Sequence, residues 1–319
     1  MISPAHAMPT SARLKAQAFG LGFDLAGIAS LGEPRTSPEF DAWLASGYAG
    51  EMHYLERGAD LRRDARRPEP GMRSAIVVAM NYGGTEPSGP VARYARGKDY
   101  HDVMREKLSG LGEWISAESG GTVRTRAFVD TGPVLERDLA RRAGLGWFGK
   151  NTNLINPKLG SFFFIGALFT DADLEADAPF EADRCGTCTR CLDACPTQAF
   201  TAPRSLDATR CISYLTIELK EEIPSEFHEA IGELLYGCDI CQDVCPWNVS
   251  FSRDLREQSF EPREFLAGKG ARDLALDILA LDQSSYARIF SGSAMKRAKL
   301  RGLQRNAKIV LANNNGAVG

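Results

Sequence analysis

The sequence predicts an α+β protein in which an α/β domain is followed by a ferredoxin-like cysteine-rich domain and a helical C-terminal segment. Three observations support this order. Helical and strand-like patterns alternate up to about residue 180, all eight cysteines fall between positions 185 and 245, and later residues show only helical patterning. We therefore expect domains over residues 1–180 and 181–252, followed by a helical segment over residues 253–319.

Composition indicates a globular protein. The 319 residues suit one large or two modest domains, and 44% hydrophobic and 25% charged residues are ordinary for such chains. The N-terminus lacks the basic stretch and apolar core of a signal peptide. The longest apolar run, FFFIGALF (162–169), is far shorter than the roughly 20 residues that cross a membrane. We expect a cytoplasmic protein with no membrane partner, whose cysteines stay reduced unless something ligates them.

The first 180 residues carry four helix signals and four strand signals. The third helix signal places Met104, Leu108, Leu111 and Ile115 on one face. The fourth begins at a proline and ends at Gly144, which suits a helix C-cap. The helix signals are TSARLKAQAF, PEFDAWLAS, HDVMREKLSGLGEWISAE and PVLERDLARRAG, and the strand signals are FDLAGIA, SAIVVAMNY, GTVRTRAFVD and GSFFFIGALF. The order of the strands is open.

The first four cysteines are spaced as in bacterial ferredoxins. Cys185, Cys188, Cys191 and Cys195 read C-x2-C-x2-C-x3-C-P, in which the fourth cysteine ligates the other cluster of a two-cluster protein. A zinc site would favour two separated pairs. Disulfides are improbable in a long cytosolic chain. The spacing therefore favours iron–sulfur clusters.

A shorter echo completes the ligand count. Cys238, Cys241 and Cys245 precede Pro246 with the same spacing, but the position matching the first cysteine is Leu235. One cysteine, Cys211, remains and can supply the missing ligand. By the crossing rule, two [4Fe–4S] clusters are expected. The first takes Cys185, Cys188, Cys191 and Cys245, and the second takes Cys195, Cys211, Cys238 and Cys241.

Two other local patterns carry less weight. GLGWFG (144–149) is a literal G-x-G-x-x-G, but it follows a helix rather than a strand, which disfavours dinucleotide binding. FVDTG (128–132) resembles an aspartic-protease loop but occurs once. From the residues alone, Asp130 is either functional or a turn residue that caps the next helix.

Longer stretches resemble one family. They are RYARGKDYH (93–101), FVDTGPVLERDLARRAGLGWFGKN (128–151), CGTCTRCLDACPTQAF (185–200), RCISYLTIELK (210–220) and YGCDICQDVCPWN (236–248). In order and together they resemble the epoxyqueuosine reductases, cobalamin-dependent enzymes that complete queuosine in tRNA. Corrinoid reductive dehalogenases share the plan of cobalamin plus two clusters, but they resemble this chain less in VDTGP and CISYLTIELK.

The resemblance implies an oxidoreductase that reduces an epoxide at the tRNA wobble position. Cobalamin would receive electrons through the clusters from an external low-potential donor of the flavodoxin or ferredoxin type. Asp130 would protonate the leaving oxygen. We expect the apolar flank of Phe128 and Val129, together with the corrin, to raise the pKa of Asp130. The residues expected to bind cobalamin are Arg57, Tyr94, Asp130, Lys150 and Asn153.

The DYH sequence (99–101) begins like the D-x-H-x-x-G loop that places a histidine on cobalt. Met104 stands where that loop has glycine. We therefore expect His101 not to be an axial ligand and cobalamin to bind base-off.

Charge bears on the RNA partner. The net charge is −3, which is not the surplus typical of an RNA-binding domain. Two runs are locally basic: residues 57–73, diluted by acids, and residues 295–308, which contain no acid. The ordinary interpretation of each run is a solvated helix face. With the resemblance, the second run becomes the better candidate for phosphate contact, through Lys296, Arg297, Lys299, Arg301, Arg305 and Lys308.

A rival function from another class is also open. An iron–sulfur carrier could pass electrons between partners without a substrate site of its own. Cobalamin binding discriminates between the two functions, because a carrier does not need it.

Overall fold

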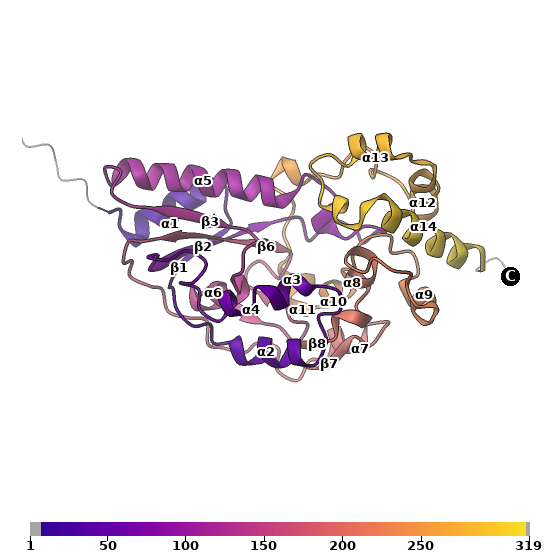
Figure 1. The fold of residues 1–319 in the computed structure, drawn as a ribbon, viewed down its shortest axis with the longest axis horizontal. Coiled ribbons are helices and arrows are strands. Elements are labelled where there is room, and N and C mark those ends of the chain that lie inside the picture. The colour runs from indigo at the N-terminus through magenta and orange to yellow at the C-terminus, as the bar shows by residue number, and fades with distance from the viewer. Residues whose placement is uncertain (1–7, 317–319) are drawn as a thin grey trace, which may run out of the picture.

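A four-stranded antiparallel sheet forms the centre of the first part of the chain (Figure 1). The computed structural model describes residues 8–316. The strand order is β1-β2-β6-β3, and every pairing in this sheet is antiparallel. All four strands match a predicted strand: β1 (Leu25–Ser30), β2 (Ser74–Asn81), β3 (Thr125–Phe128) and β6 (Phe163–Thr170). The predicted mixture of helix and sheet is therefore confirmed, with an antiparallel rather than a parallel arrangement.

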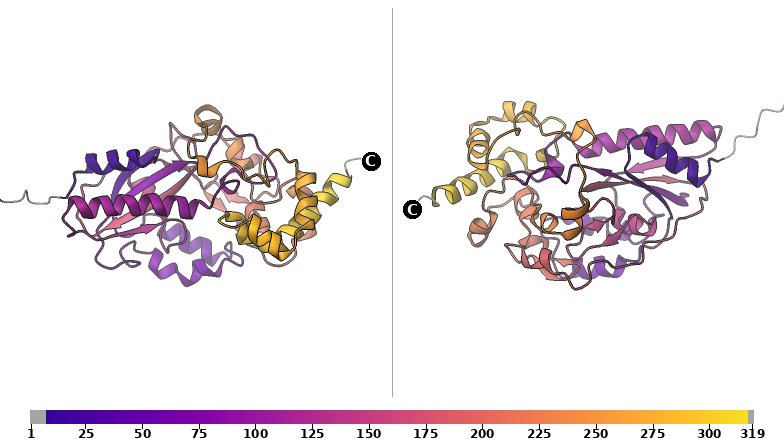
Figure 2. Two further views of the ribbon diagram at one scale, coloured as in Figure 1. Left: turned by 90° about the horizontal axis from the view of Figure 1, so that it is seen from above. Right: turned by 180° about the vertical axis from the view of Figure 1, so that it is seen from behind.

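Helices cover both faces of this sheet (Figures 1 and 2). On one face lie α1 (Ser11–Gly20), which the Thr10 side chain caps, and the long α5 (Tyr100–Glu118). On the other lies α6 (Glu136–Arg142). The predicted apolar face of α5 is confirmed, because Met104, Leu108, Leu111 and Ile115 are fully buried.

Strand β2 shows why the sheet needs both layers. All eight of its residues are buried, and successive side chains of a strand point to opposite faces. Ile76, Val78 and Met80 join the core under α1 and α5. Ala75 and Val77 join the core under α6. A strand buried on both faces reads as a continuous apolar run, as SAIVVAM does.

The fourth predicted helix starts later than expected. It was predicted to begin at Pro133, whereas α6 begins at Glu136, because the chain bends through residues 131–134 after β3. Its predicted end is confirmed: Gly144 follows the helix with φ +77°, a backbone conformation that glycine adopts without strain.

The cysteine-rich part is built mostly from short elements joined by loops. Cys191 lies in α7 (Arg190–Asp193), and Cys241 occupies the same place in α10 (Ile240–Asp243). The two helices pack against each other, so the echo in the sequence is also a repeat in structure. The other elements are β7 (Phe200–Ala202), β8 (Ser205–Leu206), α8 (Ile212–Ile217), α9 (His228–Ile231) and α11 (Pro246–Phe251).

The C-terminal part is helical, as predicted. Its helices are α12 (Ala271–Ala280), α13 (Gln283–Ile289) and α14 (Lys299–Gly316). Their shared core also includes Val91 and Tyr236 from earlier parts of the chain. The first part of the chain also contains α2 (Ser37–Ala45), α3 (His53–Arg57), α4 (Ala59–Arg62), β4 (Trp147–Phe148) and β5 (Leu154–Ile155). Among the described residues, no helix is both long and apolar enough to cross a membrane.

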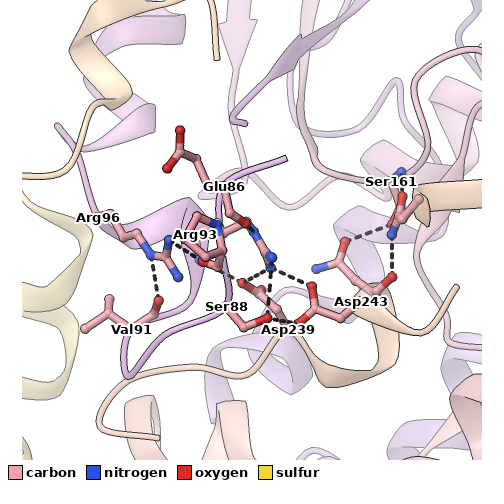
Figure 3. A network of polar contacts seen from close by, with 11 residues as sticks. Glu86, Ser88, Val91, Arg93, Arg96, Ser161, Asp239 and Asp243 are labelled. Carbon is pink, nitrogen blue, oxygen red and sulfur yellow. Dashed lines mark hydrogen bonds and ion pairs between the residues drawn. The ribbon is translucent and has the colours of Figure 1, made fainter. Parts of the chain in front are cut away.

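A buried ion network joins the first part of the chain to the cysteine-rich part (Figure 3). The guanidinium of Arg93 lies 3.1 Å from the Asp239 carboxylate and 2.7 Å from that of Asp243. Its Nε donates to the carbonyl of Glu86. Burial raises the pKa of Asp239, and Arg93 opposes this increase. Because Asp239 lies between Cys238 and Cys241, Arg93 fixes the loop that carries both thiols.

Replacing Arg93 with methionine should lower the free energy of unfolding by about 3–5 kcal/mol, because it leaves a buried carboxylate unpaired. The side chains of Arg93 and Asp239 are only 6% and 7% exposed. Urea denaturation measures the effect. In the control Arg124→Ala, which removes a more exposed pair with Asp171, the loss should be below about 1 kcal/mol. Similar losses in both variants would contradict the assignment.

Candidate cluster-binding and active site

One set of four cysteines surrounds a cavity of about 320 Å³. Cys185 and Cys188 lie in the loop before α7, Cys191 lies within α7, and Cys245 directly precedes α11. Burial raises the pKa of Cys191 to about 11, and the charges of Cys245 and Cys185 add to the increase. The structure thus brings together the four thiols predicted to bind the first cluster.

The other four cysteines form a second set. Burial raises the pKa of Cys238 to about 12, and the charges of Cys211, Asp239 and Cys195 add to the increase. The pKa of Cys241 is raised well above its ordinary value by burial and then by Cys238 and Cys211. The charge of Cys191, from the first set, also contributes to the raised pKa of Cys241, so the two sets are neighbours.

The spacing of the thiols suits clusters rather than single ions. Within residues 8–316, no three His, Cys, Asp or Glu side chains converge closely enough to hold one metal ion. A cubane is larger than an ion, and its four thiolates lie apart at its corners. The cavity of about 320 Å³ between the first four thiols is consistent with such a group.

Several donors approach the thiols and their loops. The indole N–H of Trp147 donates to Sγ of Cys185 at 3.5 Å, and the backbone N–H of Ala199 donates to Sγ of Cys195 at 3.3 Å. Hydrogen bonds to cluster sulfurs are one of the factors that set reduction potential. The ammonium of Lys150 donates to the carbonyls of Gly186 and Cys188, at 2.7 and 2.9 Å.

Asp130 occupies a special backbone position just after β3. Its φ is +56°, in the left-handed region that few non-glycine residues adopt. The hydroxyl of Tyr100 donates to Asp130 Oδ2 at 2.8 Å. The ring of Tyr100 is in turn stacked on Phe164 of β6, with centroids 4.2 Å apart. The core of the sheet therefore positions an aspartate whose side chain is 66% exposed.

His101 connects Asp130 to a second carboxylate. Its Nδ1 lies 2.6 Å from Asp99 Oδ1, and its Nε2 lies 3.4 Å from Asp130 Oδ2. Burial lowers the pKa of His101, but the hydrogen bonds to Asp130 and Asp99 outweigh it and raise the pKa to about 9. His101 is therefore protonated at neutral pH. Since both ring nitrogens face carboxylates, the geometry is consistent with the prediction that His101 is not an axial ligand.

The expected direction of the Asp130 pKa is corrected. Although the side chain is 66% exposed, the surrounding protein partly desolvates it and tends to raise this pKa, as predicted from Phe128 and Val129, but the interactions with His101 and Tyr100 outweigh this effect and lower it. The proton of the pair consequently resides on His101 at neutral pH. The interpretation of Asp130 as a helix cap is also wrong, because α6 begins after Leu135 without a side-chain cap.

The residues predicted to bind cobalamin lie in different surroundings. Tyr94 lies beside Tyr100. Burial raises the pKa of Tyr94, and the charges of Tyr236 and Tyr100 add to the increase, with a smaller contribution from Asp130. Arg57 is exposed at the end of α3. Asn153 is half-buried in the loop after β4, and its backbone carbonyl accepts a hydrogen bond from the backbone N–H of Gly149. Lys150 lines the cavity of the first cysteine set, which favours a structural role at that loop.

The sequence did not single out a second group of charges near Asp130. Burial and the charge of Asp130 raise the pKa of Glu136 to about 8. Partial desolvation by the surrounding protein lowers the pKa of Arg137 and of Arg62, while the charges of Asp130 and Glu136 oppose these shifts. In the sequence these residues look like ordinary charges of an amphipathic helix, so only the fold brings them to Asp130.

The C-terminal basic run divides into two kinds of residue. Arg305 is buried and donates to the carbonyls of Leu215 and Leu219, so its inclusion among the phosphate contacts was wrong. Arg297 pairs with Glu218 at 2.7 Å. The remaining side chains are exposed and are Lys296, Lys299, Arg301 and Lys308.

Replacing His101 with glutamine should remove a pH-dependent part of the stability. The pKa of His101 is raised from 6.5 to about 9, so its charged form stabilises the fold below about pH 6.5. This contribution disappears as the pH rises through about 9. We expect the wild type to have the higher Tm at pH 6 and the difference to vanish by about pH 10. The control His53→Gln, at an exposed site, should melt like the wild type throughout.

Two adjacent sets of four thiols, together with an exposed carboxylate that contacts Tyr100 and His101, are typical of an iron–sulfur oxidoreductase. Residues 184–248 match the family model described as 4Fe-4S double cluster binding domain, and residues 62–131 match that of epoxyqueuosine reductase QueG, DUF1730. The epoxyqueuosine reductase of Leadbetterella byssophila is 45% identical over 94% of this chain and 98% of its own. That of Escherichia coli is 39% identical, over 98% of this chain and 83% of its own. The chain belongs to the epoxyqueuosine reductase family, as the resemblance predicted.

Solved structures agree with the assignment. An epoxyqueuosine reductase bound to an epoxyqueuosine-modified tRNA-Tyr stem loop superposes with a TM-score of 0.86 and 33% identity, covering 96% of this chain and 82% of that one. A Bacillus subtilis epoxyqueuosine reductase, with its catalytic aspartate loop swung out of the active site, gives a TM-score of 0.84 and 32% identity, with the same coverage. The chain is therefore an enzyme of the oxidoreductase class with a double [4Fe–4S] domain.

Proposed function

We propose that this protein reduces the epoxide of epoxyqueuosine at the wobble position of tRNA to the alkene of queuosine. The conversion consumes two electrons and two protons and releases water. The observation that carries the proposal is the similarity to an epoxyqueuosine reductase over 94% of the chain. This similarity disfavours both a simple electron carrier and a corrinoid dehalogenase. The site contributes thiols for electron transfer and a hydrogen-bonded carboxylate for proton transfer.

Each set of thiols holds one cluster in this proposal. Cys185, Cys188, Cys191 and Cys245 surround one cavity, which supports their assignment to the first cluster. The second cluster takes the other set, Cys195, Cys211, Cys238 and Cys241. These thiols lie close enough that the charges of some raise the pKa of others.

The surroundings of Asp130 fit a cobalamin. Its carboxylate is 66% exposed, and the buried Nε2 of His101 lies at a long 3.4 Å from Asp130 Oδ2. Tyr94 and Tyr100 border the same place. When bound, cobalamin would supply a strongly nucleophilic, low-potential metal centre. Arg57, Tyr94, Asp130 and Asn153 would contact it, whereas Lys150 would act on it only through the cluster loop.

Proton transfer to the leaving oxygen is assigned to Asp130 with His101. The low pKa of Asp130 and the raised pKa of His101 place the proton on the imidazolium. As negative charge develops on the substrate oxygen, the proton of His101 would pass to Asp130 and from Asp130 to that oxygen. Asp99 would hold the imidazole ring in position through its 2.6 Å contact with Nδ1.

The tRNA and the cell compartment complete the proposal. The exposed lysines and arginines of residues 296–308 are the candidates for phosphate contact. An external donor of the flavodoxin or ferredoxin type would supply the electrons. A tRNA substrate and eight cysteines left free for iron both favour the cytoplasm.

The function is tested with protein reconstituted with iron, sulfide and cobalamin under anaerobic conditions. With a low-potential chemical reductant, it should convert epoxyqueuosine to queuosine in tRNA, as measured by mass spectrometry of digested nucleosides. Omitting cobalamin should abolish conversion while the clusters remain reducible. Reducible clusters without conversion in the complete mixture would instead support the electron carrier.

A further inference from the structure

The surface beside the first cysteine set contains exposed aromatic groups. The cavity of this set is also lined by Trp247 and Phe251, both in α11. Phe251 is 42% exposed, and its neighbour Val249 is 72% exposed, among the few large hydrophobic side chains with such exposure in the described residues. Since α11 starts directly after Cys245, this apolar surface adjoins a proposed cluster ligand.

The charge of this surface is predominantly positive. Arg184 lines the cavity, and its guanidinium lies 5.5 Å from the ring centroid of Phe180. Arg190 lies between two cavity-lining cysteines in the chain. Neither arginine forms an ion pair within residues 8–316, whereas Asp183 is paired with Arg204 at 2.5 Å. The carboxylate of Asp193 accepts a hydrogen bond from Thr189, and Glu181 is paired with Arg35 and Arg141.

Two cysteines of the first set lie in an exposed loop. Cys185 and Cys188 lie in a loop whose residues 181–190 are mostly exposed. In the second set, Cys211 and Cys238 pack against the apolar core that includes Ile212 and Leu215. A carrier docked at the exposed loop would therefore lie beside ligands of the first set.

We propose that this surface, formed by Arg184, Arg190, Trp247 and Phe251 and here called the entry face, docks an acidic electron-carrier protein. The inference rests on the proposed function and names the partner that feeds its clusters. In each encounter the carrier is oxidised by one electron and the enzyme is reduced by one. No bond changes and no proton moves, and two encounters supply the electrons for one epoxide.

The chemistry of the entry face suits such a partner. Opposite charge steers two proteins together and can raise association rates 10- to 1,000-fold, by order of magnitude. A small apolar centre adds contact area without making the complex permanent, as in other weak redox encounters. An acidic carrier fits the two unpaired arginines, whereas a basic one would be repelled.

The test uses the holoenzyme with both clusters and, as the probe, an acidic bacterial ferredoxin reduced photochemically. Anaerobic stopped-flow absorbance gives the rate constant of cluster reduction as a function of salt. For the wild type the rate constant should fall as salt rises. Arg184→Glu should lower it by about tenfold or more at low salt and flatten its salt dependence. Phe251→Ser should lower it without changing that dependence.

Two controls separate docking from other effects. Arg288→Glu, which makes the same charge change at an exposed residue of α13, should leave the rate constant near the wild-type value. Reduction by methyl viologen, a small cation, should not slow in Arg184→Glu. Unchanged rates and salt dependence in both Arg184→Glu and Phe251→Ser would overturn the entry face. Conversion of epoxyqueuosine with a chemical reductant tests the proposed function independently of this result.

Discussion

Asp130→Asn should reduce the turnover of epoxyqueuosine in tRNA by about 10²- to 10⁴-fold, the usual contribution of a general acid. The amide keeps the shape of the carboxylate and can still accept the hydrogen bond from the Tyr100 hydroxyl. In the wild type this bond is 2.8 Å long. It cannot exchange a proton with His101. Single-turnover conversion of modified tRNA by the fully reduced holoenzyme measures the effect on chemistry rather than on electron supply.

Two further measurements decide what the loss means. Cluster content, cobalamin binding and tRNA affinity should be unchanged in Asp130→Asn, since the variant removes an acid and no cofactor ligand. His101→Gln should also slow the reaction and change its pH profile, because the proton of the pair resides on His101 at neutral pH. A near wild-type rate in Asp130→Asn would exclude the acid, and loss of cobalamin would instead make Asp130 a cofactor ligand.

Cys211→Ser should remove the second cluster alone and abolish turnover. The iron content should fall from about eight to about four atoms per chain, because each cubane holds four irons. Cys211 directly precedes α8, and its charge contributes to the raised pKa of Cys238 and Cys241. Iron analysis and the electron paramagnetic resonance spectrum of the reduced protein show which cluster survives.

Cys185→Ser is the matched control for this experiment. It changes a thiol of the first set and should leave the second cluster, with its ligand Cys211, in place. The two variants should therefore give different residual spectra while both fail to turn over. Loss of both clusters from a folded Cys211→Ser protein, or of neither, would show that the eight thiols are partitioned differently.

Local patterns determined much of the fold. The continuous apolar run of β2 and the 3.6-residue spacing on α5 predicted a buried strand and an amphipathic helix, and both are present. They were readable because burial on two faces or on one face imposes a fixed period on the sequence. The start of α6 was placed three residues early, since Pro133 suits both a helix start and the turn that it in fact occupies.

The cysteine spacing alone predicted which thiols belong together, because a cubane requires four ligands and the fourth cysteine of a ferredoxin run ligates the other cluster. Only the tertiary structure decided the state of the acid. The sequence beside Asp130 is apolar and suggested a raised pKa, but Tyr100 and His101 arrive from α5, about 30 positions earlier, and their hydrogen bonds lower it. Arg305 changed from a phosphate contact to a buried donor for the same reason: the partners of a charge are set by packing between distant segments, which no local pattern records.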